Sequence, residues 1–127
     1  MKDLSILIIE DDEVAAEILQ NFVQNKFPDA RVEWCWNGYE ALVRVADFGP
    51  DLIFLDYMMP KIDGTLFLRD LKCLESKGAC KVAIVSAYVD EDRRREFLDV
   101  GADYVVDKPI QIEEIHAILD EVVKQRA

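Results

Sequence analysis

52-LIFLDYMMPKIDG-64 is the stretch of sequence that decides the fold. Four apolar residues run directly into an aspartate, Asp56, and the chain then meets Pro60 and Gly64. A carboxylate at the end of a buried strand loses its hydration, and this loss is costly unless the charge is compensated. We therefore expect Asp56 either to reach solvent or to lie in a pocket that stabilises its charge.

The size and composition of the chain indicate one soluble globular domain spanning residues 1–127. The sequence has 127 residues, of which 51% are hydrophobic and 32% are charged, and a chain of this length can bury a core without disulfides or metals. Its 26 acidic residues against 15 Lys and Arg give a net charge of −11. Because phosphate backbones attract basic surfaces, we expect no direct contact with nucleic acid.

The cysteines and the N-terminus favour a cytoplasmic location. Cys35, Cys73 and Cys80 form no CxxC pair, and an odd number of cysteines without a secretory leader is typical of reduced thiols. The apolar run 4-LSILII-9 is too short for a signal peptide or a membrane span. We expect no membrane association, and buried or surface packing roles for the thiols.

Short apolar runs alternate with helical patterns along the chain. The strands are predicted at 5–9, 31–36, 52–56, 81–86 and 104–106, and the helices at 14–23, 39–48, 65–74, 90–99 and 112–123. The runs at 5–9, 52–56 and 81–86 are apolar throughout, as expected when helices cover both faces of a parallel sheet. The sequence therefore predicts a three-layer α/β/α sandwich of (βα)5 order.

Charged and polar residues stand where the predicted strands end. Glu10 and Asp11 follow the first strand, Asp56 ends the third, Ser86 ends the fourth, and Lys108 comes shortly after the fifth. Ligands of open parallel sheets bind outside the carboxyl ends of the strands. We therefore expect three acids, a hydroxyl and an ammonium group at one edge of the sheet, with Asp56 in a prepared pocket.

These residue types point to phosphoryl chemistry assisted by Mg²⁺. Three clustered carboxylates repel one another unless a cation lies between them, and a small set of oxygen ligands suits Mg²⁺. Lys108 and Ser86 can neutralise and hydrogen-bond a phosphoryl oxygen, so that Asp56 can act as a nucleophile and form an acyl phosphate. The single histidine, His116, falls on the last predicted helix, away from this edge.

Five short motifs, taken in order, resemble the receiver domain of two-component response regulators. They are Glu10-Asp11, the stretch from Asp56 to Gly64, Ser86-Ala87, Gly101-Ala102-Asp103, and Lys108-Pro109. Single motifs of this kind are weak signals, whereas five at successive strand ends are specific. The resemblance covers essentially the whole chain and implies a flavodoxin-like sheet with strand order 2-1-3-4-5.

The resemblance also implies how a metal ion would be held. Asp11 matches the direct Mg²⁺ ligand, and Glu10 matches the acid that holds the ion through water. Glu10 replaces the commoner Asp, and its longer arm still suits a contact through water. Asp56 and the backbone carbonyl of Met58 match further ligands. Asp12 is expected to cap the first helix rather than to bind metal.

Further roles in the phosphorylation pocket follow from the same resemblance. Asp56 matches the phosphoacceptor, Ser86 the switch hydroxyl and Lys108 the lysine that contacts the phosphoryl group. The bond from Lys108 to Pro109 is expected to be cis, as it usually is in the family. Partners of the family imply a histidine kinase or a histidine phosphotransfer protein as the donor.

Three positions carry residues that affect the signalling expected from the family. Val105 stands where the family usually has Phe or Tyr, and Tyr104 is predicted to face the other side of its strand. The switch is therefore expected to rely on the loop after Ser86 and on the following helix. Met58 and Tyr88 are bulky and offer little to orient a water molecule, which predicts slow self-dephosphorylation.

The run from Arg93 to Arg95 allows two interpretations. The first is a solvated helix face that Glu91 and Asp92 offset, and it is the one we favour. The second is a patch for partner binding, because receivers often meet partners on the surface formed by helix 4, strand 5 and helix 5.

The sequence leaves several functions to compare. A phosphorylation switch is favoured, and the domain is not expected to be an enzyme beyond its own phosphotransfer and dephosphorylation. A haloacid dehalogenase-type phosphatase would need a second Asp at Met58, and a flavodoxin-type flavin carrier would need a phosphate loop where residues 10–12 are acidic. Four questions stay open: whether the receiver only binds partners, whether it forms a homodimer, which output protein it meets, and whether it is a stand-alone protein or part of a longer one.

Overall fold

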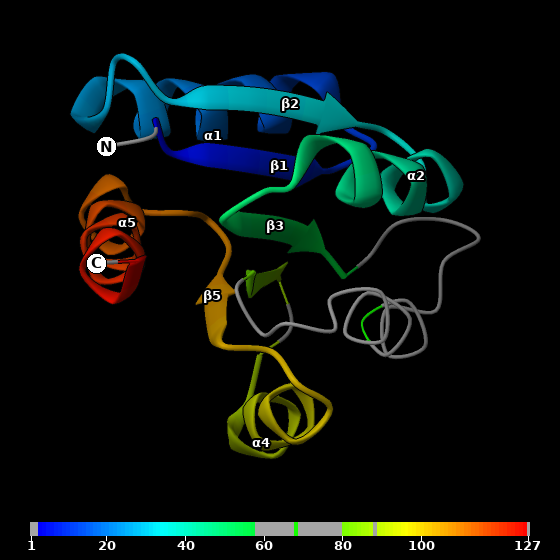
Figure 1. Cartoon of the computed structure of the whole chain (residues 1–127). Helices are drawn as coiled ribbons and strands as arrows, with labels where there is room; N and C mark the ends of the chain where they lie inside the picture. Colours follow the sequence, from blue (N-terminus) through cyan, green and yellow to red (C-terminus); the bar gives the residue numbers. More distant parts are fainter. Residues whose placement is uncertain (1–2, 58–67, 69–79, 88, 127) are drawn as a thin grey trace.

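The computed structural model describes residues 3–57, 68, 80–87 and 89–126. Its centre is a parallel sheet of five strands in the order β2-β1-β3-β4-β5 (Figure 1), as the resemblance predicted. The strands are β1 (Ser5–Ile9), β2 (Arg31–Cys35), β3 (Leu52–Asp56), β4 (Lys81–Ser86) and β5 (Tyr104–Asp107). The helices are α1 (Glu13–Lys26), α2 (Gly38–Phe48), α4 (Glu91–Asp99) and α5 (Ile112–Arg126).

The helix predicted at 65–74 lies outside the described residues, except for Leu68. The side chain of Leu68 is fully buried in the core on the α2 and α4 side of the sheet.

Two apolar cores cover the two faces of the sheet. Successive residues of a strand point to opposite faces, so Leu7 and Ile9 join the core beneath α2 and α4, while Ile6 and Ile8 join the core beneath α1 and α5. All five residues of β1 and of β3 are buried, which explains why apolar residues fill these strands without alternation, apart from Ser5 and Asp56 at their ends. Figure 1 shows these helices packed around the sheet, and the predicted three-layer sandwich is confirmed.

Polar side chains begin the helices at the carboxyl edge of the sheet. The Asp12 carboxylate accepts hydrogen bonds from the backbone N–H groups of Val14, at 2.9 Å, and Ala15, at 3.4 Å, which confirms its predicted capping role. Asn37 caps α2 in the same way. Gly49 ends α2 in the left-handed conformation, with a φ of 62°, where a side chain would be strained.

Strand β5 places its first two residues on opposite faces of the sheet. Val105 is buried in the core beneath α4, while Tyr104 packs with the core beneath α1 and α5. The ladder pairs Ile84 with Val105, so the strand keeps the predicted register. Tyr104 therefore does not supply the aromatic ring that position 105 lacks.

The two cysteines that the structure describes, Cys35 and Cys80, have the packing role expected from the sequence. Cys35 and Cys80 are buried in the core beneath α2 and α4, and burial, with the nearby charge of Glu40, raises the pKa of Cys35 to about 11. Cys73 lies outside the described residues.

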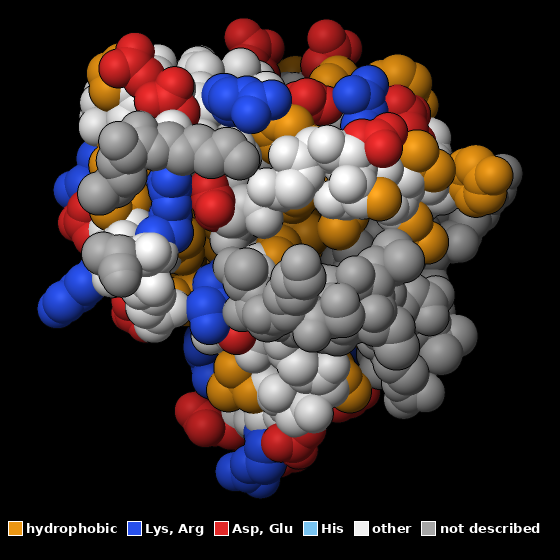
Figure 2. Space-filling model, in the orientation of Figure 1, with side chains coloured by type: hydrophobic (Ala, Val, Ile, Leu, Met, Phe, Trp, Pro, Cys, Tyr) orange, Lys and Arg blue, Asp and Glu red, His pale blue; other side chains and the backbone are white. Residues whose placement is uncertain are grey.

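In the part of the chain that the structure describes, no helix combines the length and apolar character needed to cross a membrane. Figure 2 shows acidic and basic side chains interspersed on one face, with apolar side chains gathered over α2.

Candidate functional site

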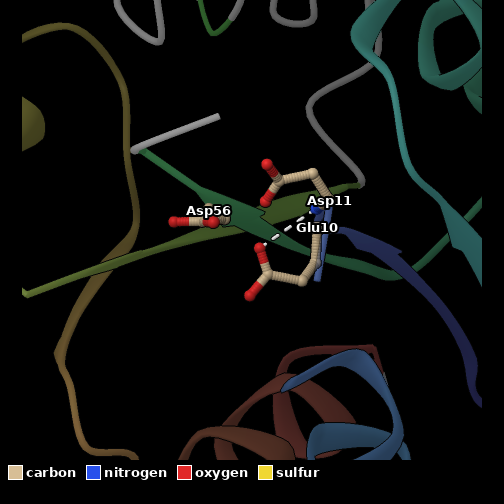
Figure 3. Close-up of side chains that lie close together, drawn as sticks. All are labelled: Glu10, Asp11 and Asp56. Carbon is tan, nitrogen blue, oxygen red and sulfur yellow. Dashed lines mark hydrogen bonds between the residues drawn. The ribbon is translucent and has the colours of Figure 1, made fainter. Parts of the chain in front are cut away.

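Three carboxylates meet at the carboxyl edge of the sheet. Strands β1 and β3 are neighbours, with Ile9 opposite Leu55, so the residues that follow come together. One carboxylate oxygen from each of Glu10, Asp11 and Asp56 lies within 4.8 Å of the others, and the three side chains could hold a metal ion (Figure 3). We call these three residues the acid cluster. Glu10 and Asp56 are each only 6% exposed, so Asp56 lies in a pocket rather than in open solvent.

Lys108 contacts two members of the acid cluster. Its Nζ lies 3.4 Å from Asp56 Oδ1 and 3.6 Å from Glu10 Oε1. Burial works to lower the pKa of Lys108, but the carboxylates of Asp56 and Glu10 outweigh it and raise that pKa, so the ammonium group stays charged. Its backbone N–H donates to the Ser86 carbonyl at 2.9 Å, which attaches the loop after β5 to β4. The Lys108–Pro109 peptide bond is cis.

The electrostatics of Glu10 indicate that the cluster suits a cation. The pKa of Glu10 is raised to about 8, chiefly by burial and further by a hydrogen bond with Asp56 and by the charge of Asp56, and the charge of Lys108 opposes this shift only in part. A carboxyl group that holds its proton near neutral pH lacks sufficient positive charge around it. The donor set is made of oxygen atoms alone, which fits Mg²⁺.

Ser86 lies at the same edge, one strand further along. Asp56 pairs with Val85 in the ladder between β3 and β4, and Ser86 is the next residue after Val85. Its side chain is almost completely buried, with 1% exposed. The structure thus brings together Glu10, Asp11, Asp56, Ser86 and Lys108 as the sequence predicts, whereas Met58 and Tyr88 lie outside the described residues.

The backbone of Glu10 is held by β2, a feature that the sequence analysis did not predict. The Glu10 N–H donates to the Cys35 carbonyl at 3.0 Å. The indole Nε1 of Trp34 donates to the Glu10 carbonyl at 2.6 Å. The next N–H, that of Asp11, donates to Glu10 Oε2 at 3.1 Å (Figure 3). The sequence signal for this arrangement is a tryptophan one residue before the end of the neighbouring strand, which does not identify its acceptor.

Tyr57, the residue after Asp56, connects β3 to α4. Its N–H donates to the Val85 carbonyl at 3.1 Å, which extends the ladder by one residue. Its ring meets the ring of buried Phe97 edge to face, with centroids 4.7 Å apart. The Arg93 guanidinium lies 5.3 Å from the centroid of the Tyr57 ring, within the range of a cation–π contact.

Two of the three successive arginines of α4 contact the rest of the domain. Besides Arg93 on Tyr57, Arg94 Nη1 donates to the Val105 carbonyl at 3.3 Å, and Arg94 Nη2 lies 3.8 Å from Asp107 Oδ2. Arg95 is exposed. Arg93 and Arg94 are thus partly exposed, as a solvated face requires, and they also contact the rest of the domain.

Neither His116 nor Asp12 is a member of the acid cluster. His116 Nε2 lies 2.9 Å from the Phe22 carbonyl of α1, so it connects α5 to α1 and is not a member of the metal-binding group. Asp12 is the helix cap. A cavity of about 580 Å³ adjoins the acid cluster between α1 and the loop after β5. Its charged lining residues are Glu10, Asp12, Asp56 and Lys108, and the rest of its lining is apolar.

The fold and the acid cluster together define a flavodoxin-like α/β domain with a carboxylate pocket at the edge where such folds bind their ligands. Residues 6–120 match the family model described as the response regulator receiver domain. The chain belongs to this family of two-component signalling switches, whose members interact with histidine kinases and output domains.

The comparisons with individual proteins agree with this assignment. The chain is 33% identical over 113 residues to the autoinducer 2 sensor kinase/phosphatase LuxQ of two Vibrio vulnificus strains. The match covers 89% of this chain but only 13% of LuxQ, so the chain spans a small part of the length of these relatives.

Two receiver structures have the same fold. The first is the signal receiver domain of a DNA-binding response regulator from Colwellia psychrerythraea, which is 28% identical with a TM-score of 0.89 and covers 96% of this chain and 99% of that one. The second is the receiver domain of the Francisella response regulator 1452, which is 26% identical with a TM-score of 0.85 and covers 98% of this chain and 100% of that one.

Proposed function

We propose that this chain is a phosphorylation-dependent switch in which Asp56 accepts a phosphoryl group from a phosphohistidine. One observation carries the proposal: Asp56 is buried at the end of β3, with Lys108 Nζ at 3.4 Å and two further carboxylates within 4.8 Å. Such a site suits a nucleophile whose charge must be controlled while phosphorus is transferred. We also propose that residues 1–127 form a single receiver domain.

In the proposed reaction, an oxygen of the Asp56 carboxylate attacks the phosphorus atom of the phosphohistidine. The new O–P bond forms as the P–N bond breaks, and the electron pair of the broken bond leaves with the imidazole. The Lys108 ammonium group lies beside the attacking carboxylate, where it can neutralise the negative charge of the incoming phosphoryl oxygens. The burial of Asp56 limits the access of water to the acyl phosphate.

We propose that Glu10, Asp11 and Asp56 hold Mg²⁺, with the backbone carbonyl of Met58 as a further ligand taken from the family resemblance. When bound, this ion supplies positive charge that offsets the carboxylates and the phosphoryl oxygens. The oxygen-only donor set and the raised pKa of Glu10 support this assignment.

We propose that the phosphoryl group draws the Ser86 hydroxyl and the loop after β4 inward, and that the surface of α4, β5 and α5 changes as a result. This would be a shift between two states of the domain. Because Val105 replaces the usual aromatic residue, the response depends on this loop and on α4. The donor is proposed to be a histidine kinase or a histidine phosphotransfer protein, and the relatives named sensor kinase/phosphatase are consistent with such a donor.

The proposal is tested by incubating the protein with acetyl phosphate and Mg²⁺ and measuring its intact mass. We expect the wild-type chain to gain the mass of one phosphoryl group and Asp56→Asn to gain none. Asp51→Asn is a matched control, because Asp51 precedes β3 at the opposite edge of the sheet, and it should be phosphorylated. A wild-type chain that stays unmodified, or an equal gain on Asp56→Asn, would overturn the proposal.

A further inference from the structure

We propose that Trp34 is a positioning residue for the acid cluster and that it strengthens Mg²⁺ binding through the backbone of Glu10. This inference rests on the proposed function, and it assigns a role in that site to a residue of the edge strand β2. The observation behind it is the 2.6 Å hydrogen bond from the Trp34 indole Nε1 to the Glu10 carbonyl.

The hydrogen-bonded carbonyl belongs to the peptide unit that joins Glu10 to Asp11. A peptide unit is planar, so fixing its C=O also fixes the direction of its N–H. That N–H, on Asp11, donates to Glu10 Oε2 at 3.1 Å. One rigid unit therefore links the indole to a carboxylate of the acid cluster, and hydrogen bonds arranged in such a series polarise and strengthen one another.

The other backbone group of Glu10 is also attached to β2. Its N–H donates to the Cys35 carbonyl at 3.0 Å, directly after the last ladder pair, Ile9 with Cys35. Both backbone polar groups of Glu10 are therefore hydrogen-bonded to β2. Nothing in the sequence of β2 predicts that this strand has a role in the site. A carboxylate on an anchored backbone loses less conformational entropy when it binds an ion.

The Trp34 ring is itself held in place. Trp34 is paired with Ile8 in the ladder, packs against the core beneath α1 and α5, and meets the ring of Trp36 edge to face at 5.6 Å. Trp36 is 55% exposed. An indole N–H needs an acceptor when it is buried, but packing alone does not require that acceptor to be the carbonyl of a metal-binding acid.

The test compares Trp34→Phe with Trp36→Phe. Trp34→Phe keeps an aromatic ring in the core and removes the N–H donor, whereas Trp36→Phe makes a similar change without touching Glu10. We expect Trp34→Phe to raise the Kd for Mg²⁺ by about 3- to 10-fold, a smaller loss of affinity than that seen when direct partners of metal ligands are removed. Trp36→Phe should keep the wild-type Kd. The Kd is measured by calorimetry, and urea unfolding of each variant without Mg²⁺ verifies that it is folded.

A second measurement keeps Trp34 intact. In Trp36→Phe labelled with ¹⁵N, the only indole N–H resonance is that of Trp34, and we expect it to shift on titration with Mg²⁺ at the concentrations that saturate the site. An unmoved resonance, or a folded Trp34→Phe that binds Mg²⁺ as tightly as the wild type, would overturn the role of Trp34. A wild-type protein that binds no Mg²⁺ would instead overturn the metal site of the proposed function.

Discussion

The ends of β1 and β3 carry acids that are equally buried, yet the two ends are attached to different parts of the molecule. Glu10, after β1, is bonded through its backbone to the edge strand β2. Asp56, at the end of β3, is followed by Tyr57, whose ring lies against Phe97 of α4. Both acids therefore lie on backbone that is paired with a neighbouring strand, but only Asp56 is followed by a residue whose side chain contacts a helix.

Under the proposed function, this difference separates two tasks of the pocket, metal binding and phosphoryl acceptance. A metal ligand benefits from a backbone that does not move, because the ion then meets preformed geometry. A phosphoacceptor in a switch must instead pass its change of state to a surface, which requires contact with an element that has another stable position. The attachment of β1 to β2 fits the first task, and that of Tyr57 to α4 fits the second.

The largest expected effect concerns the acids that follow β1. Asp11→Asn should weaken Mg²⁺ binding on the order of 100-fold, at the upper end of what partners of metal ligands show, because it removes a charged oxygen ligand. The control is Asp12→Asn, which removes a neighbouring charge and keeps a good helix cap. Calorimetry on both variants checks the prediction, and equal losses would mean that general charge rather than direct ligation controls the affinity.

The next prediction breaks the contact between β3 and α4. Tyr57→Ala should lower the free energy of unfolding by about 2 kcal/mol, because it removes half-buried ring contacts, and it should speed amide hydrogen exchange in α4 more than in α1. Tyr57→Phe keeps the ring and should change both quantities little. Urea unfolding and exchange measured by mass spectrometry test this, and uniform acceleration across α1 and α4 would contradict a local contact.

The third prediction uses the pH dependence of Glu10. The pKa of Glu10 is raised from 4.5 to about 8 in the folded protein, so between these values the folded state binds more protons than the unfolded state. Without Mg²⁺, the contribution of Glu10 to stability is therefore fully present at low pH and is lost as pH rises towards 8. Glu10→Gln stays neutral, so its stability relative to the wild type should rise between pH 5 and pH 8 by about 1 to 2 kcal/mol.

Urea unfolding in the presence of a chelator, at several pH values, measures this difference. Glu40→Gln is the matched control, because Glu40 lies on α2, away from the acid cluster. If Glu10→Gln and the wild type show parallel stability curves across the range, the raised pKa of Glu10 is wrong.

The smallest expected effect concerns the arginines of α4. Arg94→Ala should cost about 0.5 to 1 kcal/mol of stability, because it removes a hydrogen bond to Val105 and a partly exposed ion pair. Arg95→Ala should stay within about 0.5 kcal/mol of the wild type, as is usual for exposed positions. Thermal unfolding of both variants distinguishes them, and a larger loss for Arg95→Ala would mean that the contacts of Arg94 contribute nothing.

The parts of this molecule that follow local patterns were predictable from the sequence. The runs at 5–9, 52–56 and 81–86, which are apolar apart from their end residues, predicted a parallel sheet covered on both faces, and parallel strands bring their carboxyl ends to one edge. That topology places Glu10, Asp11 and Asp56 at one edge of the sheet, and the strand order, which makes β1 and β3 neighbours, brings them together. The strand order came from the family resemblance, since alternation of strands and helices is compatible with more than one order.

The contacts that cross between elements were not predictable. No periodicity indicates that Trp34 donates to Glu10 or that Tyr57 meets Phe97 edge to face, because both depend on side-chain directions between separate strands and helices. The end of α5 shows the same limit. Its apolar pattern ends near residue 123, but the helix continues to Arg126, whose Nη1 lies 3.7 Å from Asp51 Oδ2.

The sharing of Lys108 between Glu10 and Asp56 would limit how far the proposed phosphorylation of Asp56 acts through charge. Three ionised carboxylates and one ammonium group leave two negative charges in the pocket, and one divalent cation cancels them. Turning the Asp56 carboxylate into a doubly charged acyl phosphate then adds a single negative charge to a chain that already carries −11. Salt screens such a change within about 8 Å, so distant partners must sense altered atomic contacts rather than a long-range field.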